Sequence, residues 1–117
     1  MALSSLVSVR ASAQYVVREI IDSTGDGAGN SLDLPIGIAR DAWGNTYVIG
    51  EYSANAFKIT PSGVITEIID RYRVGVGNFF VSPKGIAVDS AGNVYVVAAY
   101  SSNAVKSQSC CKHDGLS

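Results

Sequence analysis

The loop from Asp22 to Asp33 holds the carboxylates whose spacing comes nearest to a metal site in this chain. Asp22 and Asp26 occupy its first and fifth positions, as in a calcium-binding loop. Such a loop also needs a carboxylate or amide at the third position and a bidentate Glu at the twelfth, where this chain has Thr24 and Asp33. We therefore expect a glycine-rich connection at these residues, with no metal and no other cofactor.

A second group with chemical potential alternates bases and aromatic rings. It consists of Arg71, Tyr72 and Arg73, followed by Phe79 and Phe80. Such a set can stack nucleobases and hold phosphates. The net charge of −1, however, gives no general attraction to nucleic acid. We expect the two phenylalanines to pack inside the protein, and we keep Arg71, Tyr72 and Arg73 as candidate binding residues.

Histidine, the side chain that enzymes use most often for acid–base catalysis, occurs only once. The one histidine is His113, which lies near Cys110 and Cys111 in a spacing that matches no standard zinc motif. Histidine-based acid–base catalysis between residues 15 and 106 is therefore excluded. We predict a protein that is not an enzyme. Trp43 sits in a polar turn, so we add it to the candidate binding residues because exposed tryptophans often anchor partners.

The elements that position these residues repeat at a step of 48 residues. Pro35 recurs as Pro83, and the segment Glu19–Asp22 recurs as Glu67–Asp70. Further pairs at the same step are Gly37/Gly85, Ile38/Ile86, Asp41/Asp89, Gly44/Gly92, Asn45/Asn93, Tyr47/Tyr95, Tyr52/Tyr100, Asn55/Asn103 and Lys58/Lys106. A period of this length is typical of repeat architectures.

One repeat holds four short runs rich in β-branched or aromatic residues. They are Ile36–Asp41, Asn45–Tyr52, Ala56–Thr60 and Val64–Asp70. Polar turns containing Asp, Asn, Gly or Pro separate them, which predicts a four-stranded antiparallel meander. We therefore predict an all-β fold, a partial β-propeller with blades of about 48 residues.

Residues that recur in each blade are expected to have a structural role in each blade. Asp41 and Asn45, with their counterparts Asp89 and Asn93, are predicted to shape turns, since a catalytic group is needed once. Tyrosines 47, 52, 95 and 100 are predicted to pack between blades with their hydroxyls near the rim.

The pattern PxGIAxDxxGNxYV, followed by NAxKI-type and GVITEIID runs, resembles the NHL-repeat β-propeller family over residues 15–106. That resemblance implies a protein- or RNA-binding platform of about six blades. The chain departs from it by holding only two blades' worth of strands: one at Tyr15–Asp22, a full blade at 36–70 and three at 85–106.

Two interpretations of this short length stay open. The chain could be a fragment of a propeller that ends in unrelated sequence. Alternatively, its leading strand completes the second blade, and open blade edges join two-blade chains into a homotrimeric six-bladed ring. We predict a scaffold that binds protein or itself. The alternatives are a subunit of an assembled lyase or hydrolase with a central metal, and an RNA-binding propeller face.

The two ends of the chain lie outside the repeat. Residues 1–14 are expected to form a disordered leader or a weak signal-like segment, which leaves secretion open, and residues 107–117 an unstructured tail. No run of apolar residues is long enough to cross a membrane as a helix. The adjacent pair of cysteines does not identify the redox compartment.

Overall fold

The computed structural model describes residues 15–72 and 80–108. Its strands in the first sheet are β1 (Pro35–Arg40), β2 (Thr46–Gly50), β3 (Asn55–Ile59) and β4 (Ile65–Ile69). Those in the second sheet are β5 (Pro83–Val88), β6 (Val94–Ala98) and β7 (Asn103–Ser107). The predicted all-β class and the blade-like meanders are confirmed, and the strand boundaries differ from the predicted ones by one or two residues.

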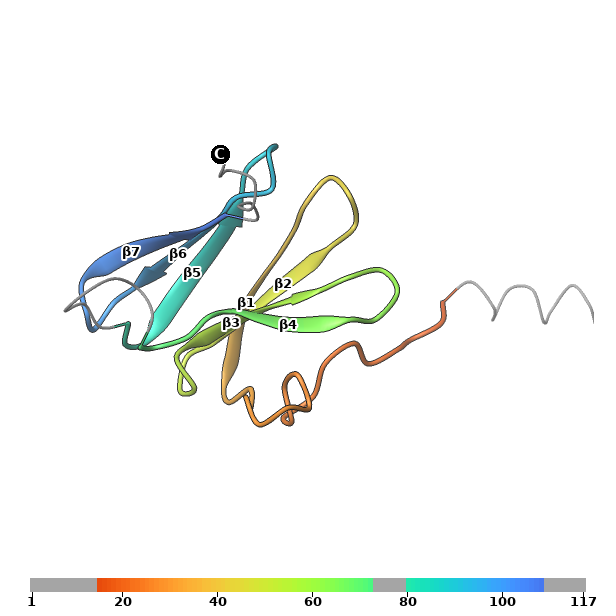
Figure 1. The fold of residues 1–117 in the computed structure, drawn as a ribbon, viewed down its shortest axis with the longest axis horizontal. Coiled ribbons are helices and arrows are strands. Elements are labelled where there is room, and N and C mark those ends of the chain that lie inside the picture. The colour runs from red at the N-terminus through yellow and green to blue at the C-terminus, as the bar shows by residue number, and fades with distance from the viewer. Residues whose placement is uncertain (1–14, 73–79, 109–117) are drawn as a thin grey trace, which may run out of the picture.

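Each sheet is an antiparallel meander in chain order, β1-β2-β3-β4 in the first and β5-β6-β7 in the second. We call these sheets the first and second blade. They lie side by side and splay apart toward one end, as Figure 1 shows. The described part of the chain contains no helix long and apolar enough to cross a membrane.

The backbone confirms that the two blades are structural repeats. Leu34 and Ser82, a step of 48 residues apart, have φ values of 59° and 61°. Ala54 and Ser102 likewise have φ values of 55° and 56°. Because non-glycine residues rarely adopt positive φ, this agreement shows that the entry into the first strand and the turn after the second strand fold in the same way in both blades.

One predicted strand is absent. Residues 15–22 form no strand, although Glu19–Asp22 repeats the sequence of the β4 region. A strand needs a ladder of hydrogen bonds from a neighbour, and the sequence of this segment suits the outer position of a blade that precedes the first one. The inner three strands of that blade are not among the described residues, so the segment runs extended beside the first blade (Figure 1).

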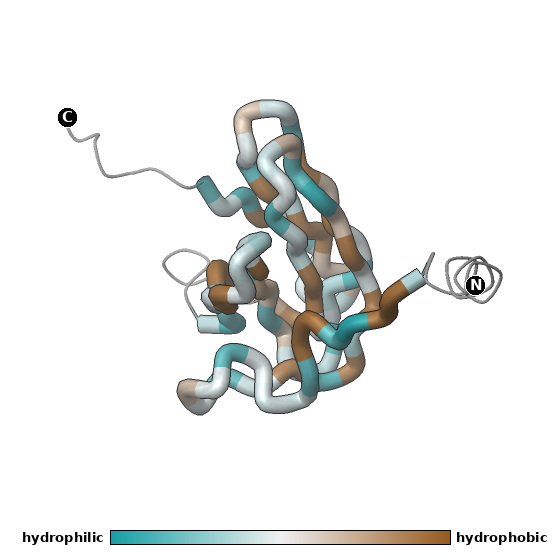
Figure 2. The backbone as a smooth tube through the Cα atoms, turned by 90° about the vertical axis from the view of Figure 1, so that its right-hand side faces the viewer, coloured by the Kyte–Doolittle hydropathy of each residue, from teal (hydrophilic) through white to brown (hydrophobic). Residues whose placement is uncertain are grey.

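The largest core lies between the blades. Tyr47, Ile49 and Ala56, on what we call the front face of the first blade, pack against Val94 and Val96 of the second blade. Val94 and Val96 lie on what we call the back face of their blade. The blades therefore stack front to back. Figure 2 shows brown apolar positions along the strands and also in the segment that follows the N-terminal grey trace. Burial of these side chains supplies the main driving force for the fold.

A second core covers the back face of the first blade. Val48 and Phe57 of that face pack with Leu32, and Ile21 from the segment before β1 lies against them. Leu32 is the counterpart of Phe80, which fills the core between the blades and is fully buried. The back of the second blade is thus covered by a blade, whereas on the back of the first blade a single extended segment covers β2 and β3 and leaves Ile38 of β1 exposed.

Candidate protein-docking surface

The turn between β1 and β2 is organised by one carboxylate. Asp41 accepts hydrogen bonds from the backbone N–H groups of Trp43 (2.9 Å) and Asn45 (3.0 Å). It also accepts from the Asn45 side chain (2.8 Å) and from the Tyr47 hydroxyl (2.8 Å). Asp89 makes the matching four bonds in the second blade. These polar residues are turn structure, as predicted.

The hydrogen bonds change how these groups titrate. Burial raises the pKa of Asp41, but the bonds from Asn45, Tyr47 and Trp43 outweigh it and lower the pKa to about 2. The side chain and N–H of Asn93 are the main causes that bring the pKa of Asp89 to about 2. Burial, followed by the bond and charge of Asp41, raises the pKa of Tyr47 to about 12.

Acid is therefore expected to destabilise the protein in a defined range. Both carboxylates have an ordinary pKa of 3.8 and a folded pKa of about 2. The stability that the two ionised carboxylates contribute to the folded protein is fully present above about pH 4 and is lost as the pH falls toward 2. The thermal unfolding midpoint should decline in that interval, and less so in Asp89→Asn. A midpoint that stays constant between about pH 4 and 2 would contradict this expectation.

The four repeated tyrosines do not share one environment. Tyr47 is buried between the blades, as predicted, and its hydroxyl reaches Asp41 at the rim. Tyr52 and Tyr100 are 73% and 83% exposed, so the prediction that they pack between blades is wrong. They sit in the turns that follow β2 and β6, where their side chains face solvent.

Trp43 is less free than its place in a turn suggested. It is 61% exposed, but its ring lies over Gly92 in the turn of the second blade. A Cβ atom added at Gly92 would be 3.2 Å from the ring atom Cζ3. Trp43 therefore links the two turns, and its role as a binding residue stays a prediction.

Arg71 and Tyr72 lie at the other end of the first blade. Nη2 of Arg71 donates to the carbonyl of Tyr52 (3.2 Å), and its guanidinium carbon is 5.9 Å from the ring centre of Tyr72. Arg73 and Phe79 lie outside the described residues. The structure does not bring Trp43 together with Arg71 and Tyr72, because an antiparallel blade places alternate turns at opposite ends.

The hollow beside Arg71 and Tyr72 has acidic walls that disfavour a phosphate. Glu67 and Asp70 contribute to its lining. Asn55, buried at its edge, donates to the carbonyl of Ser31 (2.9 Å) and to Oε2 of Glu67 (3.0 Å). Sequence reasoning did not single out Asn55, although its recurrence as Asn103 was a signal for such a structural role.

The glycine-rich loop before β1 directs its carboxylates toward itself. Asp26 accepts from the N–H of Ala28 (2.8 Å) and from the side chain of Asn30 (2.8 Å). Asp22 accepts from the hydroxyl of Thr24 (2.6 Å). Within residues 15–72 and 80–108, no three His, Cys, Asp or Glu residues gather as metal ligands. Cys110, Cys111 and His113 lie outside the described residues.

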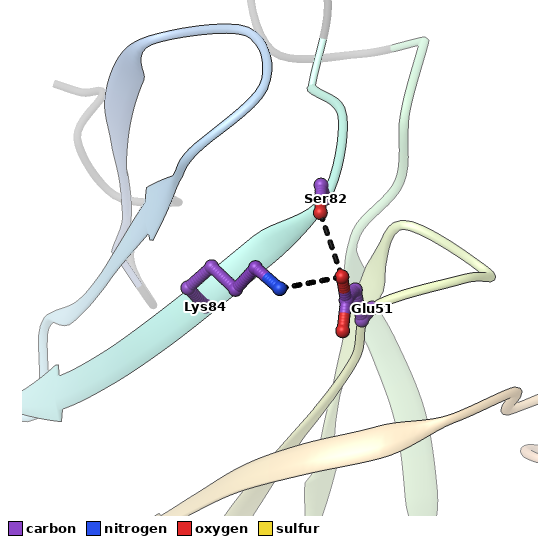
Figure 3. A network of polar contacts seen from close by, with 3 residues as sticks. All are labelled: Glu51, Ser82 and Lys84. Carbon is purple, nitrogen blue, oxygen red and sulfur yellow. Dashed lines mark hydrogen bonds and ion pairs between the residues drawn. The ribbon is translucent and has the colours of Figure 1, made fainter.

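A polar contact joins the start of β5 in the second blade to the turn that follows β2 in the first blade. Oε2 of Glu51 receives hydrogen bonds from Nζ of Lys84 (2.6 Å) and from the hydroxyl of Ser82 (2.8 Å), as Figure 3 shows. The bond from Lys84 is the first cause of the lowered pKa of Glu51. The contact is specific to this junction, because the step of 48 residues replaces Glu51 by Ala99 and Lys84 by Ile36.

The front face of the second blade is the apolar surface with the clearest structural counterpart. Tyr95 and Val97 are 39% and 52% exposed, whereas their counterparts Tyr47 and Ile49 are 3% and 0% exposed. Ala104 is also exposed, whereas Ala56 is buried. The same strand positions thus cover a neighbouring blade in one repeat and face solvent in the other.

A second apolar surface lies on the inner strand of the first blade. Leu34, Ile36 and Ile38 are 54%, 40% and 66% exposed. Their counterparts Ser82 and Lys84 bond to Glu51 in the turn after β2, and Ile86 packs against the core between the blades. Sequence reasoning expected association through open blade edges but named none of the residues of these two surfaces. The repeat held the signal, since a residue that is buried in one blade identifies its counterpart in the other blade as a position suited to burial.

Two stacked, repeated meanders define an all-β module of propeller blades. Residues 80–99, which span β5, its turn and β6, match the family model described as "SBBP: Beta-propeller repeat". No curated protein matches the chain. The chain is therefore a β-propeller repeat module.

Proposed function

We propose that this chain is a non-enzymatic protein-docking scaffold of the propeller type, with blades similar to NHL repeats. The observation that carries the proposal is the exposed front face of the second blade, formed by Tyr95, Val97 and Ala104. The equivalent face of the first blade buries itself against a β-sheet. An exposed apolar face of this kind marks a protein interaction site.

The chemistry of the other candidate sites supports a scaffold over an enzyme. Asp41 and Asp89 are occupied with turn hydrogen bonds, and Asp26 holds its own loop. Their lowered pKa values keep them ionised near pH 7, which makes them poor general acids.

The proposal is tested by photo-crosslinking in cells that produce the chain. A photoreactive residue placed at Val97 should form a covalent product with a polypeptide, identified by mass spectrometry. The product should disappear when Tyr95→Asp is added, because a charge on the face opposes docking. A photoreactive residue at Ser90, exposed in the neighbouring turn, is the control. Equal products from positions 97 and 90 would refute the proposal.

A further inference from the structure

We infer that the partner of the exposed front face is a second copy of this chain, joined front to back as the two blades are joined within one copy. The inference rests on the proposed docking function and names its partner. In this arrangement the second copy places the back of its first blade against the front of the second blade of the first copy. Residues 15–22 of the second copy then add a fourth strand beside β7 of the first copy. Three independent observations support the arrangement.

The first observation is the chemistry of the two exposed surfaces. Within one copy, Glu51 on the front side meets Lys84 on the back side as an ion pair. At a junction between copies, the same positions hold Ala99 and Ile36. Both charges are replaced together, so an apolar residue meets an apolar residue and no charge is buried alone.

The neighbouring positions agree with this match. Ile86 of the second blade lies close to Gly37 and Ile49 of the first, since a Cβ added at Gly37 would be 3.2 Å from Cγ2 of Ile86 and 3.0 Å from Ile49. The counterparts are Ile38 on one copy and Gly85 with Val97 on the other. Ile38 and Val97 are each more than half exposed in the single copy. Their contact would bury both.

The second observation is a hollow that repeats between blades. One hollow lies between the blades and has a wall formed by Thr66, Ile68, Gly92, Val94, Ser107 and Gln108. A hollow at the back of the first blade is lined by their counterparts Arg18, Ile20, Gly44, Thr46, Ile59 and Thr60. The first hollow gains a further wall from Tyr47 and Lys58. Their counterparts, Tyr95 and Lys106, stand on the exposed front face and would complete the second hollow from another copy.

The third observation is the position of the segment before β1. Ile21 packs against the back of the first blade. Its counterpart Ile69, in the outer strand β4, lies in the same way against the core at the back of the second blade. The segment therefore already occupies the place of an outer strand. It lacks only the three inner strands of a blade, which β5, β6 and β7 of another copy provide.

The pairing of β3 with β4 predicts the register of this added strand. Phe57 lies opposite Glu67, and Lys58 opposite Thr66. A shift of 48 residues places Val105 opposite Glu19 and Lys106 opposite Arg18 of the second copy. Strand addition of this kind satisfies an exposed edge through backbone hydrogen bonds. A front-to-back contact is heterologous, so copies either close into a ring or extend as a filament.

The decisive experiment measures molar mass by light scattering on the purified chain. The wild type should give multiples of 12.2 kDa. Val97→Asp and Ile38→Asp should each give monomers, because each blocks one of the two surfaces. An equimolar mixture should give one-to-one dimers and nothing larger, since one intact pair of surfaces remains. Tyr52→Asp, which places the same charge on an exposed ring elsewhere, should associate like the wild type.

Thermal melting should show that both variants remain folded, because both side chains are more than half exposed. A monomeric wild type, an associated Val97→Asp chain or a monomeric mixture would each refute the inference. If the wild type is monomeric while position 97 still crosslinks to another polypeptide in cells, the docking function stands and only the identity of the partner is wrong. If neither occurs, both proposals fail.

Disulfide trapping tests the strand register separately. Arg18→Cys and Lys106→Cys are combined in a chain with Cys110→Ser and Cys111→Ser, and oxidation should link different copies. Arg18→Cys with Ser90→Cys is the control and should not link them. The like charges of Arg18 and Lys106 also predict that Arg18→Thr associates about two- to five-fold more tightly than the wild type. Linkage of the control pair alone, or no tightening, would refute the register.

Discussion

Phe80→Ala is expected to lower the free energy of unfolding by about 3–5 kcal/mol. Phe80 is fully buried and lies between the blades with Tyr47, Ile49 and Val96. Its removal leaves a cavity at the junction that holds the second blade to the first. A domain of this size has about 5–15 kcal/mol of stability in total, so much of it would be lost.

Thermal unfolding followed by circular dichroism measures this effect. The midpoint should fall by at least about 12 °C for the expected loss. Tyr72→Ala is the matched aromatic control, because Tyr72 is 76% exposed, and its change should stay within about 0.5 kcal/mol. Equal losses in the two variants would contradict the assignment of Phe80 to the core between the blades.

Asp41→Ala is expected to cost more stability than the same change at its counterpart Asp89, even though both carboxylates accept the same four hydrogen bonds. The reason is the tyrosine that each one holds. Tyr47 is 3% exposed, whereas Tyr95 is 39% exposed. Loss of Asp41 leaves the Tyr47 hydroxyl short of a partner in a buried place, while the hydroxyl of Tyr95 can turn to water.

The expected loss for Asp41→Ala is about 2–4 kcal/mol, composed of turn hydrogen bonds and an unsatisfied hydroxyl. Urea unfolding of both variants measures the difference. Combining Tyr47→Phe with Asp41→Ala should cost less stability than the sum of the single changes. The reason is that Tyr47→Phe already removes the hydroxyl that Asp41→Ala would leave without a partner. The assignment fails if Asp89→Ala destabilises the protein as much as Asp41→Ala.

The local structure was predictable because short-range chemistry determines it. β-Branched runs separated by Asp, Asn and Gly turns predicted the strands, and the carboxylate of Asp41 acts within six residues along the chain. The repeat of 48 residues predicted that both blades fold alike, and the paired φ values of Leu34 and Ser82 confirm it.

The environment of each face was not predictable, because it depends on which blade lies beside it. Tyr47 and Tyr95 occupy the same strand position, and only the first is covered. Residues 15–22 have the sequence of a strand, yet they form none, because no strand among the described residues pairs with them.

The sequence by itself thus determined the blade, its turns and its period, since these arise from neighbouring residues. The tertiary structure alone decided which faces are buried, that Glu51 meets Lys84, and that an apolar front face remains exposed. The physical reason is that stacking joins residues far apart in the chain. Two copies of one repeat acquire different neighbours whenever one lies inside the stack and the other at its end.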